Sequence, residues 1–382
     1  MIYFDHAATT PTDPKVVEAM KPYFTKKFGN ASTIYKLGQE SKDALENSRK
    51  TCADLINAKP QEIVFTSGGT ESDNLAIQGL AKAYPKKKHI ITSNIEHAAI
   101  KNTCKHMESL GYKVTYLPVD KTGTISLEDL KKAITKDTLL VSIMTANNEI
   151  GTIQPIKKIG KICKEKNVFF HTDAVQAFGK VPININDSNI DLLSASSHKI
   201  YGPKGVGLLF VRKGIEIKPL LYGGGHEEGN RSGTENIPGV VGFAKAVKLA
   251  KENMAKRAKK EKKLREKATK EILKIEGSHL NTKAKETLPG TVNFWFEGIE
   301  GESLVLMLSE EGVAASTGSA CSTGSLRPSH VLLAIGLKPE QAHGSLRISF
   351  GKDNTEKDLN KLLKVLPRIL NKLRALSPTW KK

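Results

Sequence analysis

The segment SASSHKIYGPKG, residues 194–205, places Lys199 in a turn between two predicted strands. Apolar runs at residues 190–193 and 205–211 flank the turn and predict those strands. A lysine amine can form a Schiff base with a carbonyl if burial or a nearby cation lowers its pKa from about 10.4. The alternative, a solvated lysine in a surface loop, is the default for any single lysine. The residues at the ends of the other strands must therefore decide whether Lys199 is a Schiff-base lysine or a solvated surface lysine.

Strands and helices alternate along the chain ahead of this turn. Short apolar runs predict strands at residues 63–66, 89–92, 114–118, 139–144 and 168–171, and helical patterns lie between them at residues 70–82, 98–109, 126–134 and 156–166. Short apolar strands joined by crossover helices imply a mostly parallel sheet that is covered on both faces. The sequence therefore predicts an α/β fold.

Residues 245–274 predict one long helix. Thirteen basic residues and four glutamates lie there, and apolar residues from Val247 to Ile272 recur at a spacing of about 3.6 residues. The segments after it, at residues 292–296, 302–311, 313–315, 329–335, 346–350 and 355–375, indicate an α+β unit with a smaller sheet. We predict a large domain of residues 12–255 and a small domain of residues 1–11 and 256–382.

Composition narrows the class of protein. The 382 residues suffice for a large core, and the formal net charge of +19 raises nucleic acid as a candidate partner. Because the basic residues concentrate in the predicted long helix, a solvated charged face is the favoured interpretation and nucleic acid is disfavoured. Four dispersed cysteines without CxxC spacing speak against a zinc site and a disulfide framework, so we expect no metal and a cytoplasmic location. The sequence shows neither a signal-peptide pattern nor a long apolar run, so we expect no association with a membrane.

Polar residues follow the predicted strands, at the edge where open parallel sheets bind ligands. Gly69 and Thr70 open a helix after a strand, which favours a phosphate, although an ordinary capped helix begins in the same way. His97 and Asn148 follow two later strands. A histidine in such a place is more often structural, and adjacent amides can simply hold a turn.

Asp173 and Gln176 stand three residues apart where the chain leaves a buried strand. A buried aspartate needs a cationic or donor partner to stay charged, and a protonated pyridine nitrogen would supply one. The ordered set of a phosphate-type helix start, this aspartate, this glutamine and Lys199 predicts a pyridoxal 5'-phosphate site.

Seven motifs occur in order between Tyr3 and about Leu366. They are YFDHAATTP at residues 3–11, TSGGTES at 66–72, NNEIG at 147–151, HTDAVQ at 171–176, SHKIYGPKG at 197–205, RSGT at 231–234 and STGSACS at 316–322. With them the sequence resembles the pyridoxal-phosphate-dependent cysteine desulfurases of the IscS/NifS-like class, within the class V aminotransferases.

This resemblance implies a fold type I transferase with a mainly parallel seven-stranded sheet and a smaller α+β domain, working as a homodimer. It implies that Lys199 is the Schiff-base lysine, that Asp173 contacts the pyridine nitrogen and Gln176 the phenolate oxygen, and that His97 stacks on the ring. Asn148 would also bind the cofactor. The phosphate would be bound by Gly69, Thr70, Ser196, His198 and Thr234 of the other subunit. Asn148 and Arg347 would receive the carboxylate of L-cysteine, and Arg347 suits this task because its planar fork can donate two parallel hydrogen bonds.

Cys321 is the residue that distinguishes a sulfur enzyme within this family. It lies among serine, threonine, glycine and alanine residues, a composition that predicts a mobile loop over residues 316–325. The other cysteines have apolar neighbours in helical segments, where an inert buried thiol is the expected state. The catalytic residues are therefore predicted to be Cys321, Lys199 and His97.

The predicted function is conversion of L-cysteine to L-alanine, with the sulfur left on Cys321 as a persulfide for a partner protein. An iron–sulfur scaffold, a tRNA-thiolation protein, or both could accept this sulfur. One alternative is a selenocysteine lyase or another β-eliminating enzyme on the same fold. A second alternative is a basic RNA-binding or scaffold protein with a silent cofactor site, and the presence of both Lys199 and Cys321 counts against it.

Overall fold

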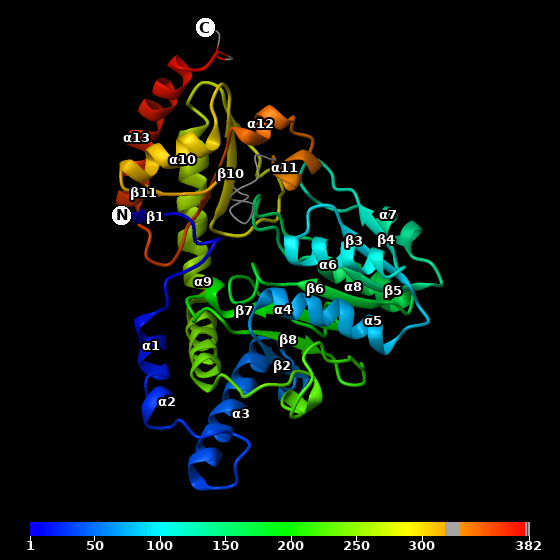
Figure 1. The fold of residues 1–382 in the computed structure, drawn as a ribbon. Helices are drawn as coiled ribbons and strands as arrows, with labels where there is room; N and C mark the ends of the chain where they lie inside the picture. Colours follow the sequence, from blue (N-terminus) through cyan, green and yellow to red (C-terminus); the bar gives the residue numbers. More distant parts are fainter. Residues whose placement is uncertain (318–327, 379, 381–382) are drawn as a thin grey trace.

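The computed structural model describes residues 1–317, 328–378 and 380. One long helix, α9 (Ile237–Ile272), runs beside a large sheet at one end and a small sheet at the other (Figure 1). Its length was expected from the apolar spacing between Val247 and Ile272. The expected apolar stripe is buried, because Val247, Ala250, Leu264, Ala268 and Ile272 are all inaccessible or nearly so.

The large sheet has seven strands, as the resemblance implies. In spatial order they are β2 (Ile63–Thr66), β8 (Gly207–Val211), β7 (Leu192–Ser196), β6 (Phe169–Asp173), β5 (Thr138–Ser142), β3 (His89–Ser93) and β4 (Lys113–Leu117). Strand β8 pairs antiparallel with both of its neighbours, and the other neighbouring pairs are parallel. The predicted α/β class with a mainly parallel sheet is confirmed.

Alternate residues of these strands supply two cores, one on each face of the sheet. Phe65, Val141 and Leu193 face one core, and their neighbours Val64, Leu140 and Leu192 face the other. The first core is closed by α1 (Pro14–Met20), α3 (Lys36–Ile56), α7 (Leu127–Ala133), α8 (Ile156–Glu165) and the first half of α9. The second is closed by the π-helical segment Leu75–Gly79, which continues α4 (Gly69–Asn74), by α5 (Leu80–Ala83) and by α6 (Ala98–Ser109). A short helix, α2 (Pro22–Thr25), follows α1.

The small sheet has the order β12 (Ser345–Ser349), β10 (Thr291–Phe296) and β9 (Ser278–Leu280), and both pairs are antiparallel. Beside it, β1 (Ile2–Tyr3) pairs in parallel with β11 (Val313–Ala314). The helices here are α10 (Gly301–Glu310), α11 (His330–Ala334), α12 (Pro339–His343) and α13 (Glu356–Ala375). The three-residue β9 and the five-residue α12 were not predicted, because such short segments carry too few residues to show a period.

The long helix contributes to two separate cores. Residues from Val240 to Ala250 pack on the large sheet, whereas Leu264, Ala268 and Ile272 pack with Phe4 and the small sheet. Two domains that meet within this helix would each need a core of their own, and the two cores agree with such a division. We therefore keep the proposal that the domain boundary follows residue 255. Among the described residues, no helix combines the length and the apolar character needed to span a bilayer.

Candidate active site

A cavity of about 420 Å³ lies beyond the carboxyl ends of the parallel strands, at the side facing the small sheet. We call it the main cavity. It brings together the following predicted site residues: Gly69, Thr70, His97, Asn148, Asp173, Gln176, Ser196, His198, Lys199 and Arg347. Its volume lies within the usual range for sites that bind small molecules and cofactors. Residues remote in sequence meet here because parallel strands place their ends along one edge.

Lys199 ends a single 3₁₀ turn, Ser197–Lys199, directly after β7. Its Nζ donates to the backbone carbonyls of Ala7 and Ala8, both at 2.7 Å. The N-terminal segment also binds the turn, because Thr10 Oγ1 donates to the carbonyl of His198 at 2.8 Å and accepts from the backbone N–H of Tyr201 at 2.7 Å. The first ten residues thus hold the lysine amine at the floor of the main cavity.

Asp173 ends β6 and is almost fully buried. Its Oδ1 accepts a hydrogen bond from the backbone N–H of Val175 at 2.8 Å. Burial raises the pKa of Asp173, while the charges of His97 and Lys199 and the Val175 bond oppose that rise. A cationic ring nitrogen in the main cavity would favour the ionised carboxylate, so this residue fits the pyridinium of pyridoxal phosphate.

A second buried aspartate lies next to Asp173 and was missed by the sequence analysis. Asp73 in α4 also lines the main cavity, and its Oδ1 has no hydrogen-bond partner among the residues that the structure describes. Burial, followed by the charge of Asp173, raises the pKa of Asp73 well above its ordinary value. Its position one helical turn after Gly69 was the available signal, because residues four apart share a helix face.

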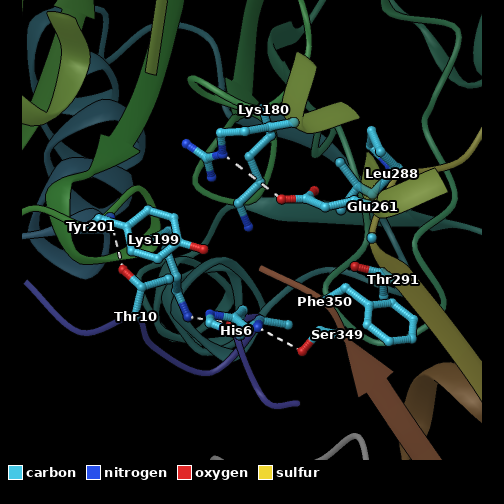
Figure 2. A pocket seen from close by; sticks show the side chains of 14 residues that line it. His6, Thr10, Lys180, Lys199, Tyr201, Glu261, Leu288, Thr291, Ser349 and Phe350 are labelled. Atoms are coloured by element: carbon cyan, nitrogen blue, oxygen red, sulfur yellow. Dashed lines mark hydrogen bonds and ion pairs between the residues drawn. The ribbon is translucent and has the colours of Figure 1, made fainter. Parts of the chain in front are cut away.

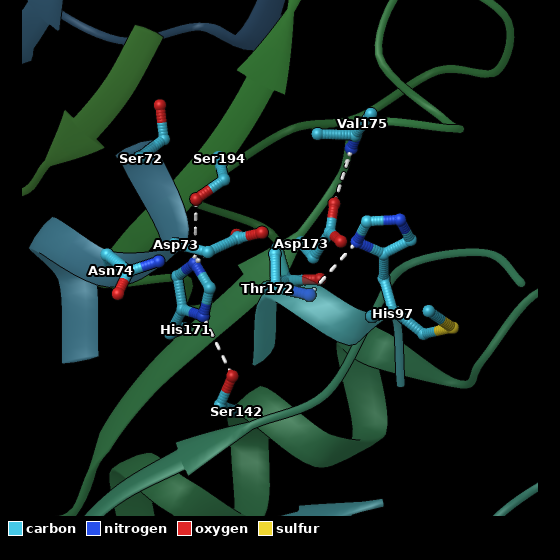
Figure 3. A network of polar contacts seen from close by, with 12 residues as sticks. Ser72, Asp73, Asn74, His97, Ser142, His171, Thr172, Asp173, Val175 and Ser194 are labelled. Carbon is cyan, nitrogen blue, oxygen red and sulfur yellow. Dashed lines mark hydrogen bonds and ion pairs between the residues drawn. The ribbon is translucent and has the colours of Figure 1, made fainter. Parts of the chain in front are cut away.

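His171 stands behind this pair of aspartates (Figure 3). Its Nδ1 lies 2.9 Å from Ser142 Oγ and its Nε2 lies 3.0 Å from Ser194 Oγ, while Asp73 Oδ1 is 3.8 Å from Nε2. Complete burial lowers the pKa of His171 to about 3, so the imidazole is neutral and gives no countercharge to either aspartate. A positive charge must therefore come from the cavity side if both carboxyls are to ionise.

The residues expected to bind a phosphate lie where α4 begins. A side chain at Gly69 would place its Cβ 2.6 Å from Val175 Cγ2, so only glycine lets the backbone approach the cavity here. Ser196 and His198 come from β7 and the turn after it. Burial and the charges of Lys199 and Lys204 lower the pKa of His198 to about 4, and its Nδ1 lies 3.0 Å from Thr9 Oγ1. Neutral donors and backbone amides of this kind suit a phosphate.

Arg347 reaches the main cavity from β12 of the small sheet. Its side chain is buried, Nη1 donates to the carbonyl of Asn148 at 3.0 Å, and Nη2 donates to Asp5 Oδ1 at 2.6 Å. The neighbouring Glu149 accepts from Ser329 Oγ at 2.5 Å, and burial raises its pKa despite the opposing charge of Arg347. Arg347 and Asn148 are thus together, as predicted, on the side of the cavity that the small sheet closes.

His97 caps the start of α6, and its Nδ1 accepts a hydrogen bond from the backbone N–H of Ala99 at 3.2 Å. That bond fixes the ring over the cavity rim beside Asp173 (Figure 3). Glu96 and His330 also line the cavity, and neither was predicted. His330 begins the short helix α11, and its sequence neighbours give no signal for this position.

One predicted residue, Thr234, is not brought into the main cavity, and another, Cys321, cannot be placed. Thr234 is exposed on the surface of this chain, in a segment that Arg231 ties to α4 through a bond from its Nε to Glu71 Oε1 at 2.9 Å. Cys321, with most of its predicted mobile loop, lies outside the described residues. The remaining cysteines, Cys52, Cys104 and Cys163, are buried, in agreement with their expected inert state.

Comparisons with known proteins agree with this geometry. The aminotransferase class-V family matches residues 2–362. A cysteine desulfurase IscS of Methanosarcina thermophila is 54% identical over 378 residues, which cover 99% of this chain and 94% of that protein. A solved NifS-like protein is 41% identical with a TM-score of 0.92, over 97% of this chain and 99% of that one. A structure described as SspA in complex with cysteine is 41% identical with a TM-score of 0.82, over 92% and 99% of the two chains.

Proposed function

The chain belongs to the aminotransferase class-V family, and we propose that within it the protein is a pyridoxal-phosphate-dependent cysteine desulfurase. It converts L-cysteine to L-alanine and transfers the sulfur to Cys321 as a persulfide, which supplies iron–sulfur cluster assembly. The observation that carries this proposal is the main cavity, where a lysine amine, a buried aspartate and an arginine from the small domain meet. The likeness to the cysteine-bound SspA structure supports L-cysteine as the substrate.

The residues of the main cavity fit pyridoxal phosphate, which supplies an electron sink for the carbanion of an amino acid when it is bound. Lys199 would hold it covalently, Asp173 its ring nitrogen, Gln176 its phenolate oxygen and His97 its ring face. Gly69, Thr70, Ser196 and His198 would hold the phosphate. We propose that Thr234 of a partner subunit joins them, since Arg231 anchors its segment to the helix that begins at Gly69.

The protein's own groups then divide the remaining work. Arg347 and Asn148 bind the substrate carboxylate, and this contact orients the Cα–H bond toward Lys199. The amine of Lys199 takes the Cα proton as a general base and returns a proton to the product. His97 receives or donates the proton of the substrate thiol. The cavity wall between the two sheets limits the access of water during these steps.

The transfer of sulfur balances without another reactant. The thiolate of Cys321 attacks the sulfur of L-cysteine, the C–S bond breaks, and its electron pair passes to the carbon skeleton, which takes up protons to become L-alanine. The new S–S bond leaves Cys321 oxidised to a persulfide and the substrate carbon reduced. One thiol and one molecule of L-cysteine therefore give one persulfide and one molecule of L-alanine.

Contacts on both sides of the cysteine segment support its access to the site. Ser316 pairs with Arg347 through two backbone bonds, and Ser345 Oγ donates to the carbonyl of Thr317 at 2.7 Å. On the far side, Ser329 is bound to Glu149. Arg347 and Glu149 both line the main cavity. Cys321 follows Ser316 by five residues, and five residues of extended chain span at most roughly 17 Å.

We further propose that the protein acts as a cytoplasmic homodimer that passes sulfur to an acceptor such as an iron–sulfur scaffold. A dimer supplies Thr234 to the neighbouring site, and an external acceptor is needed because a persulfide on Cys321 must be discharged before the next turnover. Transfer to a tRNA-thiolation protein would use the same persulfide.

The experiment that tests this function compares the wild-type protein with Cys321→Ser and with the control Cys163→Ala. Each protein is loaded with pyridoxal phosphate and given L-cysteine, and L-alanine and protein-bound persulfide are quantified. We expect Cys321→Ser to bind the cofactor but to form no persulfide and little alanine, while Cys163→Ala keeps the wild-type yield. Sulfur release by Cys321→Ser at the wild-type rate would establish the β-eliminating alternative.

A further inference from the structure

A second, smaller cavity lies behind Lys199, and we call it the rear cavity. Its volume of about 20 Å³ is enough for a single water molecule. Figure 2 shows Lys180, Lys199 and Glu261 converging on it from different parts of the chain. Ala7 and Lys199 line both cavities, so a charge in the rear cavity lies close to the reacting amine.

Lys180 connects the two cavities through Gln176. Its Nζ donates to Gln176 Oε1 at 3.1 Å, and Gln176 Nε2 donates to the carbonyl of Ala7 at 2.8 Å. The same carbonyl accepts from Lys199 Nζ at 2.7 Å. Lys180, Gln176, the Ala7 carbonyl and Lys199 therefore form one continuous chain of hydrogen bonds.

The contact with Lys180 decides which way the carboxamide of Gln176 points. With the opposite orientation, its NH₂ group would face the ammonium of Lys180 and its oxygen would face the carbonyl of Ala7. Both of those contacts are repulsive, because an ammonium only donates and a carbonyl only accepts. In the observed orientation, Gln176 keeps a second N–H for the oxygen of a bound ring.

The rear cavity also brings cations together. Loss of contact with water, followed by the charge of Lys199, lowers the pKa of Lys180 to about 7, and the charges of Arg257 and Arg347 act in the same direction. Glu261 alone among the named groups opposes them, and Arg257 Nε lies 3.8 Å from its Oε1. His6 and His198 also act on Lys180, and their pKa values are each lowered to about 4, so both are neutral near pH 7. Tyr201 lines the rear cavity too, and burial raises its pKa, so it is also neutral.

We propose that Lys180 is a positioning residue of the active site, which orients the carboxamide of Gln176 toward bound pyridoxal phosphate and places a positive charge behind Lys199. This inference rests on the proposed function. The hydrogen bond from Lys180 to Gln176 supports the proposed orientation of the carboxamide. The position of Lys180 and Lys199 in the same rear cavity supports the proposed effect of its charge. Electrostatic coupling is mutual, so Lys180 disfavours the ammonium form of Lys199 as Lys199 disfavours that of Lys180.

The first test measures the dissociation constant of pyridoxal phosphate for the full-length wild type, Lys180→Met and the control Lys161→Met, an exposed lysine of α8. Removal of a hydrogen bond from a charged donor weakens binding about tenfold. We expect this ratio between Lys180→Met and wild type at pH 6, where Lys180 is charged. It should shrink at pH 9, where Lys180 has lost its proton, and Lys161→Met should bind as the wild type does at both pH values.

The second test is a double-mutant cycle of Lys180→Met with Gln176→Ala. If Lys180 acts through Gln176, the double variant binds the cofactor no more weakly than Gln176→Ala alone. A rescue variant, Lys180→Arg, keeps both donor and charge and should bind within about threefold of wild type at pH 6, since only the geometry of one hydrogen bond changes.

The outcomes separate this inference from the proposed function. If the wild type binds no pyridoxal phosphate, the proposed function itself fails. If the wild type binds it and Lys180→Met behaves like Lys161→Met, or loses the same affinity at pH 6 and pH 9, the positioning role is wrong. Independent, additive losses in the cycle would also overturn it. Should Lys180→Met not fold, a normal cofactor affinity of Lys180→Leu, which lacks both the donor and the charge, at both pH values would contradict the proposal.

Discussion

The main cavity and the rear cavity share Lys199, but the main cavity has more carboxyl groups in its lining than the rear cavity has. Four carboxyl groups line the main cavity, those of Asp73, Glu96, Glu149 and Asp173, and burial raises the pKa of each. The rear cavity holds two cations besides Lys199, those of Lys180 and Arg257, against the single carboxyl of Glu261.

This difference shows how one amine can be given two tasks. The acidic side leaves room for a cationic ring and stabilises it, because the buried aspartates lack a countercharge of their own. The basic groups of the rear cavity disfavour the protonated form of Lys199. An amine must lose its proton before it can act as a nucleophile or a general base. This arrangement needs residues from α4, β6 and α9 and cannot be made by one strand end.

Substitution of Lys199, which lines both cavities, should have the largest effect on activity. We expect Lys199→Ala to lower kcat by at least about 10³-fold, because both the covalent attachment and the general base are lost. L-alanine formation is the readout. The control is Lys204→Ala, an exposed lysine five residues on, which should keep full activity. Activity that survives in Lys199→Ala and disappears in another lysine variant would show that the other lysine, and not Lys199, has the catalytic role.

The acidic side is tested next by Asp173→Asn. The amide keeps the size of the side chain but removes the charge that stabilises a ring cation, so kcat should fall by about 100-fold, as for loss of one preorganised electrostatic contact. The absorbance spectrum of the bound cofactor should change with it. Asp187→Asn, at an exposed aspartate, serves as the control. A normal spectrum and normal kinetics would show that Asp173 does not face the ring nitrogen.

The smallest effect is expected at Asp73, and it should appear in stability. A carboxyl whose pKa is raised in the folded state holds a proton that the unfolded chain releases above about pH 3.9, so the free energy of unfolding falls as the pH rises. Asparagine does not titrate. The Tm of the cofactor-free Asp73→Asn variant, relative to cofactor-free wild type, should therefore increase between pH 5 and pH 8, by about 1 °C for each kcal/mol in a chain of 382 residues.

Differential scanning fluorimetry across that pH range measures this change. Activity should fall less than about tenfold, as expected for the loss of a contact worth about 1 kcal/mol. A Tm difference between variant and wild type that is the same at pH 5 and pH 8 would mean that folding does not raise the pKa of Asp73. The acidic side would then rest on Glu96, Glu149 and Asp173.

The sequence predicted the parts of this site that lie at strand ends. Gly69, His97, Asp173 and Lys199 each follow an apolar run, and a parallel sheet brings such ends together without further information. Asp73 and Lys180 were missed because each follows a predicted residue by four positions inside a helical segment or turn, where charged residues are usually solvated. Their importance comes from burial by segments remote in sequence, above all the first ten residues.

Other features required contacts that no local pattern reports. Arg347 was predicted only through the family resemblance, since its reach into the main cavity depends on the pairing of β12 with β10. The strand β9 pairs only three residues, too few to show an alternating pattern. The roles of Thr234 and Cys321 stay predictions, because the first needs a partner subunit and the second lies outside the described residues.

The central claim is that Lys199, which lines both the main cavity and the rear cavity, is the lysine that binds pyridoxal phosphate. Reduction of the cofactor-loaded protein with borohydride makes the linkage permanent, and mass spectrometry of its peptides then locates it. Lys180 is the critical competitor, because its pKa of about 7 also leaves it partly unprotonated at neutral pH. We predict the cofactor on the peptide that contains Lys199. Its attachment to Lys180, or to any other lysine, would contradict this account.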